Sequence, residues 1–169
     1  MAYANELDAK VWVFHPGAKT GISQFYLGAE WKQNVESIQE LYKSAEEYGL
    51  NIALENLPGN YWFLMHKPEE FTRFYRETNL PLGITLDLGH AYLENQIEPF
   101  FNLLADKIVH IHASDNDGSD DQHLGIGKGK IDYDWFQQAI NKTGYDKTVV
   151  IESTSGVPES IKNLKKLLA

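Results

Sequence analysis

The feature of the sequence that most restricts its fold is a series of five short apolar runs, each followed at once by a polar side chain that can bind a metal ion. The runs are rich in valine and isoleucine and short enough for strands buried on both faces. Each run and the residue after it are Val11 to Phe14 with His15, Asn51 to Leu54 with Glu55, Gly83 to Leu86 with Asp87, Ile108 to Ile111 with His112, and Thr148 to Ile151 with Glu152.

Segments with the apolar spacing of helices lie between most of these runs. One such stripe extends from Val35 to Ala45 and ends before Gly49. The other predicted helices begin near Pro68, Ile97, Asp132 and Pro158. Alternating strands and helices predict parallel strands joined by right-handed helical crossovers, in one α/β domain.

The polar residues at the run ends can be interpreted singly or as a group. Taken singly, His15 before Pro16 is typical of a turn, Glu55 and Glu152 of solvated strand ends, and Asp87 of a helix cap. In a parallel α/β barrel, however, the carboxyl ends of all strands open onto one face, where active sites lie. The combination therefore predicts that these side chains converge.

A further polar segment lies between the fourth and fifth runs. Asp121 and His123 form an Asp-x-His pair that is followed by a glycine-rich stretch ending at Gly129. We assign this segment to a short additional strand and its loop, which makes about six strands in all. The backbone N–H groups around Lys128 are weak candidates for binding a phosphate.

Two other histidines, His110 and His66, receive structural interpretations. His110 has the same side-chain direction as His112, because the two are two residues apart on a strand. We expect His110 to be a hydrogen-bonded residue one layer below the ligand. We expect His66, which follows an aromatic-rich loop, to lie at the surface or at a pocket rim.

Composition narrows the possible partners and ligands. The sequence has no cysteine, so a metal must be held by His, Asp and Glu. A net charge of −9 repels a phosphate backbone and disfavours nucleic acid as a partner. Because we find neither a signal peptide nor a membrane-spanning run, we expect a cytoplasmic protein with no membrane partner.

Six motifs occur in an order that resembles the signature of the xylose isomerase-like TIM barrel superfamily. That superfamily includes sugar phosphate isomerases and epimerases, and also endonuclease IV. The motifs are His15-Pro16-Gly17, Leu54-Glu55-Asn56, Leu86-Asp87-Leu88-Gly89-His90, His112-Ala113-Ser114-Asp115, Asp121-Gln122-His123 and Ile151-Glu152.

The resemblance implies two sets of metal ligands. In the epimerase branch one divalent ion is held by the residues that match Glu55, Asp87, His112 and Glu152. In the endonuclease branch a zinc cluster also uses the residues that match His15, His90, Asp121 and His123. The cofactor implied is a divalent ion, and this ligand chemistry does not choose among manganese, zinc, magnesium and cobalt.

The resemblance also implies a partial barrel. The family barrel has eight strands, whereas residues 1–169 enter at what looks like the third strand, after a segment from Met1 to Ala9 that resembles the end of a helix. We expect a single domain with strands three to eight. Because unpaired sheet edges promote association, we predict either a homo-oligomer or a fragment. Lys128 stands where the family commonly has glutamate.

Three functional readings remain open. In an isomerase or epimerase for a sugar or sugar phosphate, Glu55 and Glu152 would act as base and acid, and His90 would orient a substrate oxygen. Trp62, Phe63 and Lys128 would contact the substrate. The alternatives are a zinc-dependent phosphodiesterase that cleaves DNA at abasic sites, and an inactive remnant that binds metal or serves as a scaffold.

Overall fold

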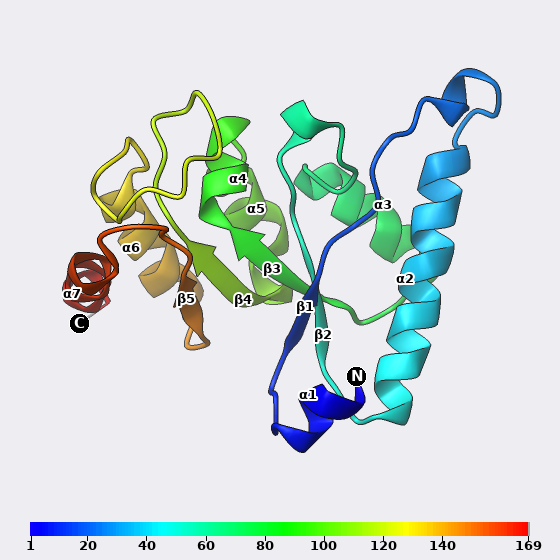
Figure 1. Ribbon diagram of the computed structural model, residues 1–169, viewed down its shortest axis with the longest axis horizontal. Coiled ribbons are helices and arrows are strands. Elements are labelled where there is room, and N and C mark those ends of the chain that lie inside the picture. Colours follow the sequence, from blue (N-terminus) through cyan, green and yellow to red (C-terminus); the bar gives the residue numbers. More distant parts are fainter. Residues whose placement is uncertain (169) are drawn as a thin grey trace.

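The computed structural model describes residues 1–168 and contains one sheet of five parallel strands. The strands follow one another in the sheet in sequence order, as the alternating pattern predicts. Figure 1 shows that the sheet is curled like half of a barrel, with the long helices on its outer side. The strands are β1 (Trp12–Phe14), β2 (Ile52–Glu55), β3 (Gly83–Asp87), β4 (Ile108–Ala113) and β5 (Val149–Ile151).

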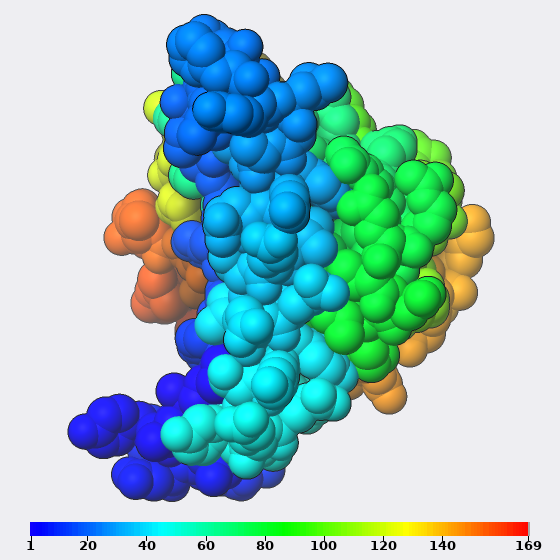
Figure 2. Space-filling view, turned by 90° about the vertical axis from the view of Figure 1, so that its right-hand side faces the viewer, coloured from blue at the N-terminus to red at the C-terminus, as the bar shows by residue number. Residues whose placement is uncertain are grey.

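Helices connect the strands on the convex side. Figure 2 shows α2 extending across one face of the molecule beside α3. The helices are α1 (Ala2–Glu6), α2 (Ala29–Glu47), α3 (Pro68–Thr78), α4 (Leu88–Leu93), α5 (Ile97–Leu104), α6 (Tyr133–Thr143) and α7 (Val157–Leu167). Short 3₁₀ turns are η1 (Ile22–Gln24), η2 (Gly59–Tyr61) and η3 (Ala105–Lys107). In residues 1–168, no helix combines the length and apolar character needed to cross a membrane.

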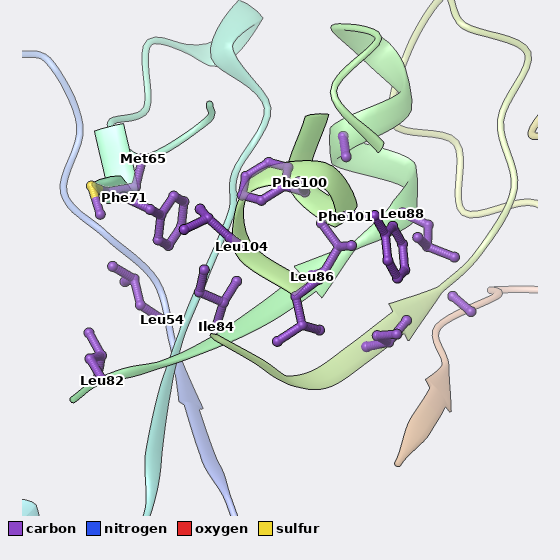
Figure 3. Close-up of a cluster of buried hydrophobic side chains, with 14 of the residues drawn as sticks. Leu54, Met65, Phe71, Leu82, Ile84, Leu86, Leu88, Phe100, Phe101 and Leu104 are labelled. Carbon is purple, nitrogen blue, oxygen red and sulfur yellow. The ribbon is translucent and has the colours of Figure 1, made fainter. Parts of the chain in front are cut away.

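The core lies between the outer face of the sheet and the helices. Alternate strand residues such as Leu54, Ile84 and Leu86 point outward, where they meet Phe71 and Phe100 (Figure 3). These side chains are almost completely buried. Since burying one such side chain contributes about 1.5–3 kcal/mol, this layer dominates the stability of the half-barrel.

The predicted helix boundaries have local causes in the sequence. Pro68 stands at the first position of α3, and the Asp132 side chain caps α6 by accepting a hydrogen bond from the backbone N–H of Trp135. Gly144 ends α6 with a φ of 66°, a left-handed conformation that glycine adopts without strain. The sequence pattern did not predict the short helix α4.

The expected sixth strand is absent from the described residues, so that prediction is wrong. The segment from Asp121 to Gly129 forms only an isolated antiparallel bridge between Asp115 and Leu124. The carboxylate of Asp115 accepts hydrogen bonds from the backbone N–H groups of Gly127 and Ile131, which curls the segment into a loop. The outer strands of the sheet are β1 and β5, and self-association through their edges stays a prediction.

Candidate metal centre

Strand register brings four side chains together at the carboxyl ends of the strands. Asp87 pairs with His112 in the ladder between β3 and β4, and Glu55 ends β2 on the same inner face. Glu152 follows β5, and its backbone N–H donates to the carbonyl oxygen of Ala113 at 3.0 Å. We call Glu55, Asp87, His112 and Glu152 the strand-end group, because each offers one ligand atom and these atoms lie within 4.8 Å of one another.

The strand-end group is compact and largely removed from water. His112 Nδ1 lies 3.2 Å from Glu55 Oε1, 3.2 Å from Glu152 Oε1 and 4.0 Å from Asp87 Oδ2. Asp87 is fully buried, and its Oδ2 atom has no hydrogen-bond partner within residues 1–168. An unpaired buried carboxylate oxygen is costly. A cation would remove that cost, so the donor set fits a metal ion.

Electrostatics in the strand-end group favour a bound cation. Burial raises the pKa of Asp87 to about 6, against the lowering effect of His90. Burial also acts to raise the pKa of Glu55, but its hydrogen bond and charge interaction with His112 hold that pKa below the usual value. Because these acids compete for the available positive charge, a divalent ion would relieve their mutual repulsion.

Asn56 connects the strand-end group to its surroundings, a role that the sequence analysis missed. Its Oδ1 accepts a hydrogen bond from the backbone N–H of Asp87 at 2.7 Å, and its Nδ2 donates to the carbonyl of Asp87 at 3.2 Å. The carbonyl oxygen of Asn56 lies 2.9 Å from His90 Nδ1. The available signal was an amide next to the candidate ligand Glu55, at the end of an apolar run.

The helix α4 places His90 beside the strand-end group. Asp87 caps this helix, because its Oδ1 accepts a hydrogen bond of 2.7 Å from the backbone N–H of His90. The two carboxylate oxygens of Asp87 therefore have different roles: Oδ1 caps the helix, and Oδ2 is available to bind an ion. The structural reading of Asp87 as a cap and its reading as a ligand are compatible.

A second cluster stands next to the first. Asp121 Oδ2 lies 3.2 Å from His90 Nε2 and 3.1 Å from His123 Nε2. We call His90, Asp121 and His123 the loop group, and they also could hold an ion. Burial acts to lower the pKa of His90, but its hydrogen bond to Asp121 and the charges of Asp87 and Asp121 raise that pKa to about 9.

His15 is the fourth residue of the predicted second metal set. Its side chain is 65% exposed, and its Nε2 atom lies 3.2 Å from Glu55 Oε2. His15 therefore contacts the strand-end group, and it does not belong to the compact set formed by His90, Asp121 and His123.

A cavity of about 450 Å³ opens over both groups. Leu57, Pro58, Tyr61 and Phe63 form an apolar wall on one side of it. The Tyr61 hydroxyl donates a hydrogen bond to Asp120, which links the loop after β2 to the loop after β4. The other lining residues are His15, Glu55, His90, Asp121, His123 and Glu152.

Two predicted substrate contacts lie elsewhere. Trp62 is 67% exposed and lines a separate cavity together with Trp31 and Arg73. Its neighbours Tyr61 and Phe63 face the candidate site, so the intervening side chain points to the other side of the segment. Lys128 is exposed on the glycine-rich loop. Of the three predicted contacts, Phe63 alone is among the residues that line the cavity.

The glycine-rich loop is not free to surround a phosphate. The N–H of Gly127 donates to Asp115 Oδ2 at 3.0 Å, and the N–H of Ile126 donates to Ser160 Oγ at 3.0 Å. The N–H of Lys128 donates to the carbonyl of Gly125. These groups are already used within the fold, so the weak candidates for binding a phosphate are not available to one.

Two histidines differ from their expected environments. His110 packs edge-on against His112, with ring centroids 5.3 Å apart, as their shared direction predicts. Its buried Nδ1 atom nevertheless has no hydrogen-bond partner in the part of the chain that the structure describes. His66 is only partly exposed, because its side chain is 15% exposed and lies between Glu70 and Glu94, and its alternative place at a pocket rim stays a prediction.

The chain is similar in sequence to proteins named as sugar epimerases and to one named as a probable endonuclease. A family model described as xylose isomerase-like TIM barrel matches residues 1–167. An uncharacterized protein of Methanocaldococcus jannaschii is 35% identical over 98% of this chain and 64% of its own length. A ketose 3-epimerase of Arthrobacter globiformis is 30% identical over 66% of this chain and 37% of its own. A probable endonuclease 4 of Thermosipho africanus is 28% identical over 92% of this chain and 60% of its own length.

Solved structures agree with the family model. A D-tagatose 3-epimerase-like protein has a TM-score of 0.86 and 34% identity, over 98% of this chain and 64% of that one. The IOLI protein with a bound zinc atom has a TM-score of 0.75 and 25% identity, with the same two coverages. The chain thus spans about two thirds of the length, or less, of the proteins it matches. With its curled parallel sheet and its match over residues 1–167, the chain belongs to the xylose isomerase-like TIM barrel family.

Proposed function

We propose that this site performs metal-dependent isomerisation or epimerisation of a sugar or sugar phosphate. The observation that carries the proposal is the convergence of Glu55, Asp87, His112 and Glu152 from four strands, with a buried oxygen of Asp87 left unpaired within residues 1–168. Relatives named as sugar epimerases support the reaction class. Fold alone would be a weak guide, since one barrel supports many chemistries.

The donor set suits a hard or borderline divalent ion. Three carboxylates and one imidazole fit manganese, magnesium, cobalt or zinc. When bound, such an ion would polarise a substrate carbonyl and stabilise the negative charge that develops when the neighbouring proton leaves. A structure with bound zinc among the similar folds is consistent with this choice.

Glu55 and Glu152 are suited to move the proton. They arrive from different strands, yet each has a carboxylate oxygen 3.2 Å from His112 Nδ1, so they lie at one site. One carboxylate would remove the proton next to the carbonyl, and the other would return it. Glu152 also lines the cavity and its side chain is 32% exposed, which gives a substrate access to it.

His90 and the apolar wall would position the sugar. Asp121 and the carbonyl of Asn56 hold the two ring nitrogens of His90, which fixes the ring at the edge of the cavity. A bound sugar would take the place of Asp121 at Nε2, and His90 would then orient a substrate oxygen through that nitrogen. Phe63 and Tyr61 would cover the carbon face of the sugar and exclude water.

The direct test is epimerisation of free and phosphorylated ketoses by the purified chain with added manganese. Product sugars are separated by chromatography, and exchange of the carbon-bound proton with deuterium oxide reports the first step. We expect turnover that Glu152→Gln abolishes and that the exposed α7 variant Glu159→Gln retains. Metal binding without any turnover or exchange would instead favour the inactive metal-binding reading.

Endonuclease-like hydrolysis is the second candidate, and the loop group is the observation in its favour. His90, Asp121 and His123 could hold a further ion beside the strand-end group. Against it stand the net charge of −9 and the lack of Lys or Arg among the described residues that line the cavity. Cleavage of an abasic oligonucleotide, with its salt dependence, would test this reading.

A further inference from the structure

A further set of titratable side chains lies outside the candidate metal centre, among residues that do not line its cavity. His66 ends the loop that follows β2, and it lies between Glu70 on α3 and Glu94 at the end of α4. The three side chains are only 15%, 24% and 21% exposed, respectively. Partly buried charged groups cost free energy unless they are paired, and these three side chains are paired with one another. We therefore ask what these contacts hold in place.

The contacts of His66 join the end of the loop to two helices, α3 and α4. His66 Nδ1 lies 2.7 Å from Glu94 Oε2 and donates to it, while His66 Nε2 lies 3.4 Å from Glu70 Oε2. The backbone N–H of His66 also donates to Glu70 Oε2 at 2.9 Å. We call the contact between His66 and Glu94 the clamp, because it ties the end of the loop to the helix that carries His90.

Gly59 shows how closely the loop packs on the clamp. A Cβ atom at this position would overlap both Glu94 Oε1 and His66 Nδ1. Gly59 opens the turn η2, which Figure 1 shows beside the upper end of α4. A side chain at this position would push the ends of the Glu94 and His66 side chains aside and so disturb the clamp.

The clamped loop carries the apolar wall of the cavity. Tyr61 and Phe63, which line the cavity, lie between the two clamped positions Gly59 and His66. The opposite side of the loop is held separately, by the bridge between Ala18 and Phe63. The clamp therefore connects the Tyr61 and Phe63 end of the wall to α4, whereas the contact of His90 Nδ1 with the carbonyl oxygen of Asn56 connects the start of the same loop to α4.

We propose that His66 and Glu94 are positioning residues that set the distance between the apolar wall and His90, and so control sugar binding. This inference rests on the proposed function, because it assigns the wall to a sugar. The clamp touches none of the four strand-end ligands, so its loss should leave metal binding intact. Weakened substrate positioning would appear mainly in KM, because the wall binds ground state and transition state alike.

Kinetics with the ketose that the protein turns over provide the first test. His66→Ala and Gly59→Ala should each raise KM about tenfold while kcat changes less than about twofold, since small displacements of positioning groups have effects of this order or larger. His66→Asn should restore most of the loss, because its amide keeps an N–H donor near the position of Nδ1. Metal content should stay at the wild-type level. A fall in kcat or metal content with KM unchanged would overturn the proposal.

Hydrogen exchange provides a test that does not need turnover. In His66→Ala and Glu94→Ala, amide exchange should rise in residues 57–65, and it should stay unchanged in the matched variant Glu98→Ala, which alters a residue of α5 outside the clamp. Unchanged exchange in residues 57–65 would contradict the clamp even if the enzyme is active. If exchange rises but the wild type turns over no ketose, the proposed function fails while the clamp is retained. Calorimetric binding of D-fructose to the manganese-loaded protein then decides whether the clamp affects sugar binding. Weaker binding in His66→Ala would support the clamp, whereas equal binding or none would overturn its role in sugar binding.

Discussion

The strand-end group and the loop group are neighbours, yet they are held in place by different parts of the fold. Glu55, Asp87 and His112 belong to strands, and ladder hydrogen bonds fix their backbone positions. Asp121 and His123 belong to a loop, and their side chains are held by each other, by His90 and by one contact of His123 Nδ1 with the carbonyl oxygen of Glu152. The strand-end group should therefore be preformed and rigid, whereas the loop group should depend on its own hydrogen bonds.

The two groups also contain side chains that differ in exposure to solvent. The side chains of Glu55 and Asp87 are 4% and 0% exposed, whereas those of Asp121 and His123 are 18% and 28% exposed. A charge deep in the sheet costs more when its partner is removed than one near the loop surface. We therefore expect substitutions in the strand-end group to have larger effects.

The largest effect should come from Asp87→Asn. This change keeps an acceptor for the backbone N–H of His90 but removes the negative charge next to the unpaired buried oxygen. Loss of the ion would cost several kcal/mol of transition-state stabilisation, so we expect turnover to fall roughly 10³-fold or more. Steady-state kinetics and metal content measure this. An active, metal-loaded variant would show that the strand-end group does not bind the ion.

Asn56→Ala should have the next largest effect, because Asn56 supports Asp87 without binding the ion itself. Two buried backbone groups of Asp87 would lose their partners, which should lower the free energy of unfolding by about 2–3 kcal/mol. The affinity for the ion should fall about 10–100-fold, as for other supporting residues. Thermal unfolding and metal titration check both effects. Unchanged metal affinity would mean that backbone register alone holds Asp87.

Asp121→Asn tests the loop group through the pH dependence of the metal-free chain. The pKa of His90 is raised to about 9, so protonated His90 stabilises the fold fully below its unfolded pKa of about 6.5. That stabilisation is lost as the pH rises through about 9. Because Asp121 supplies part of the shift, the variant should be less stable by on the order of 1–2 kcal/mol near pH 6 and equal to wild type above pH 9.

Chemical unfolding in EDTA at several pH values measures this difference. The exposed variant Asp134→Asn on α6 is a matched control, and we expect its stability difference from wild type to be the same at every pH. A constant deficit for Asp121→Asn between pH 6 and pH 10 would contradict the assigned role of the charge.

His15→Ala should have the smallest effect. Its side chain is 65% exposed, so the free energy of unfolding should change by less than about 0.5 kcal/mol. Binding of the first ion should weaken by less than about threefold if His15 only borders the strand-end group. A loss of half of the bound metal would instead favour a site with several ions. Metal titration of the variant against wild type distinguishes these outcomes.

The sequence predicted the strand-end group well because strands impose a simple rule. Apolar runs of fixed direction carry their last residues to one face, so the strand pattern predicted that Glu55, Asp87 and His112 converge. The same pattern also included His15, and only the family resemblance set His15 apart from these ligands. The strand boundaries differ by one or two residues: β4 extends to Ala113, and β3 includes Asp87. The α/β class, the parallel order and the caps of α3 and α6 also follow from local patterns.

The loops could not be predicted in the same way. Asp115 curls the glycine-rich segment because its buried carboxylate accepts N–H groups up to sixteen residues away, a contact that leaves no periodic signal. Trp62 has a left-handed φ of 65° in an irregular segment and lies on the opposite side from Tyr61 and Phe63, and no periodic pattern in this loop predicts which side faces the cavity. The contact of His66 with Glu94 spans 28 residues, and the sequence around neither residue predicts it.

The most direct test of the proposed metal centre is metal content by elemental analysis of wild type and Glu152→Gln. Glu152 is the most exposed member of the strand-end group, so this substitution should leave the chain folded while removing one charged ligand. We predict about one bound divalent ion per wild-type chain and a clear loss in the variant, with unchanged circular dichroism. Equal metal content in the two proteins, or none in either, would contradict a metal centre at the strand ends.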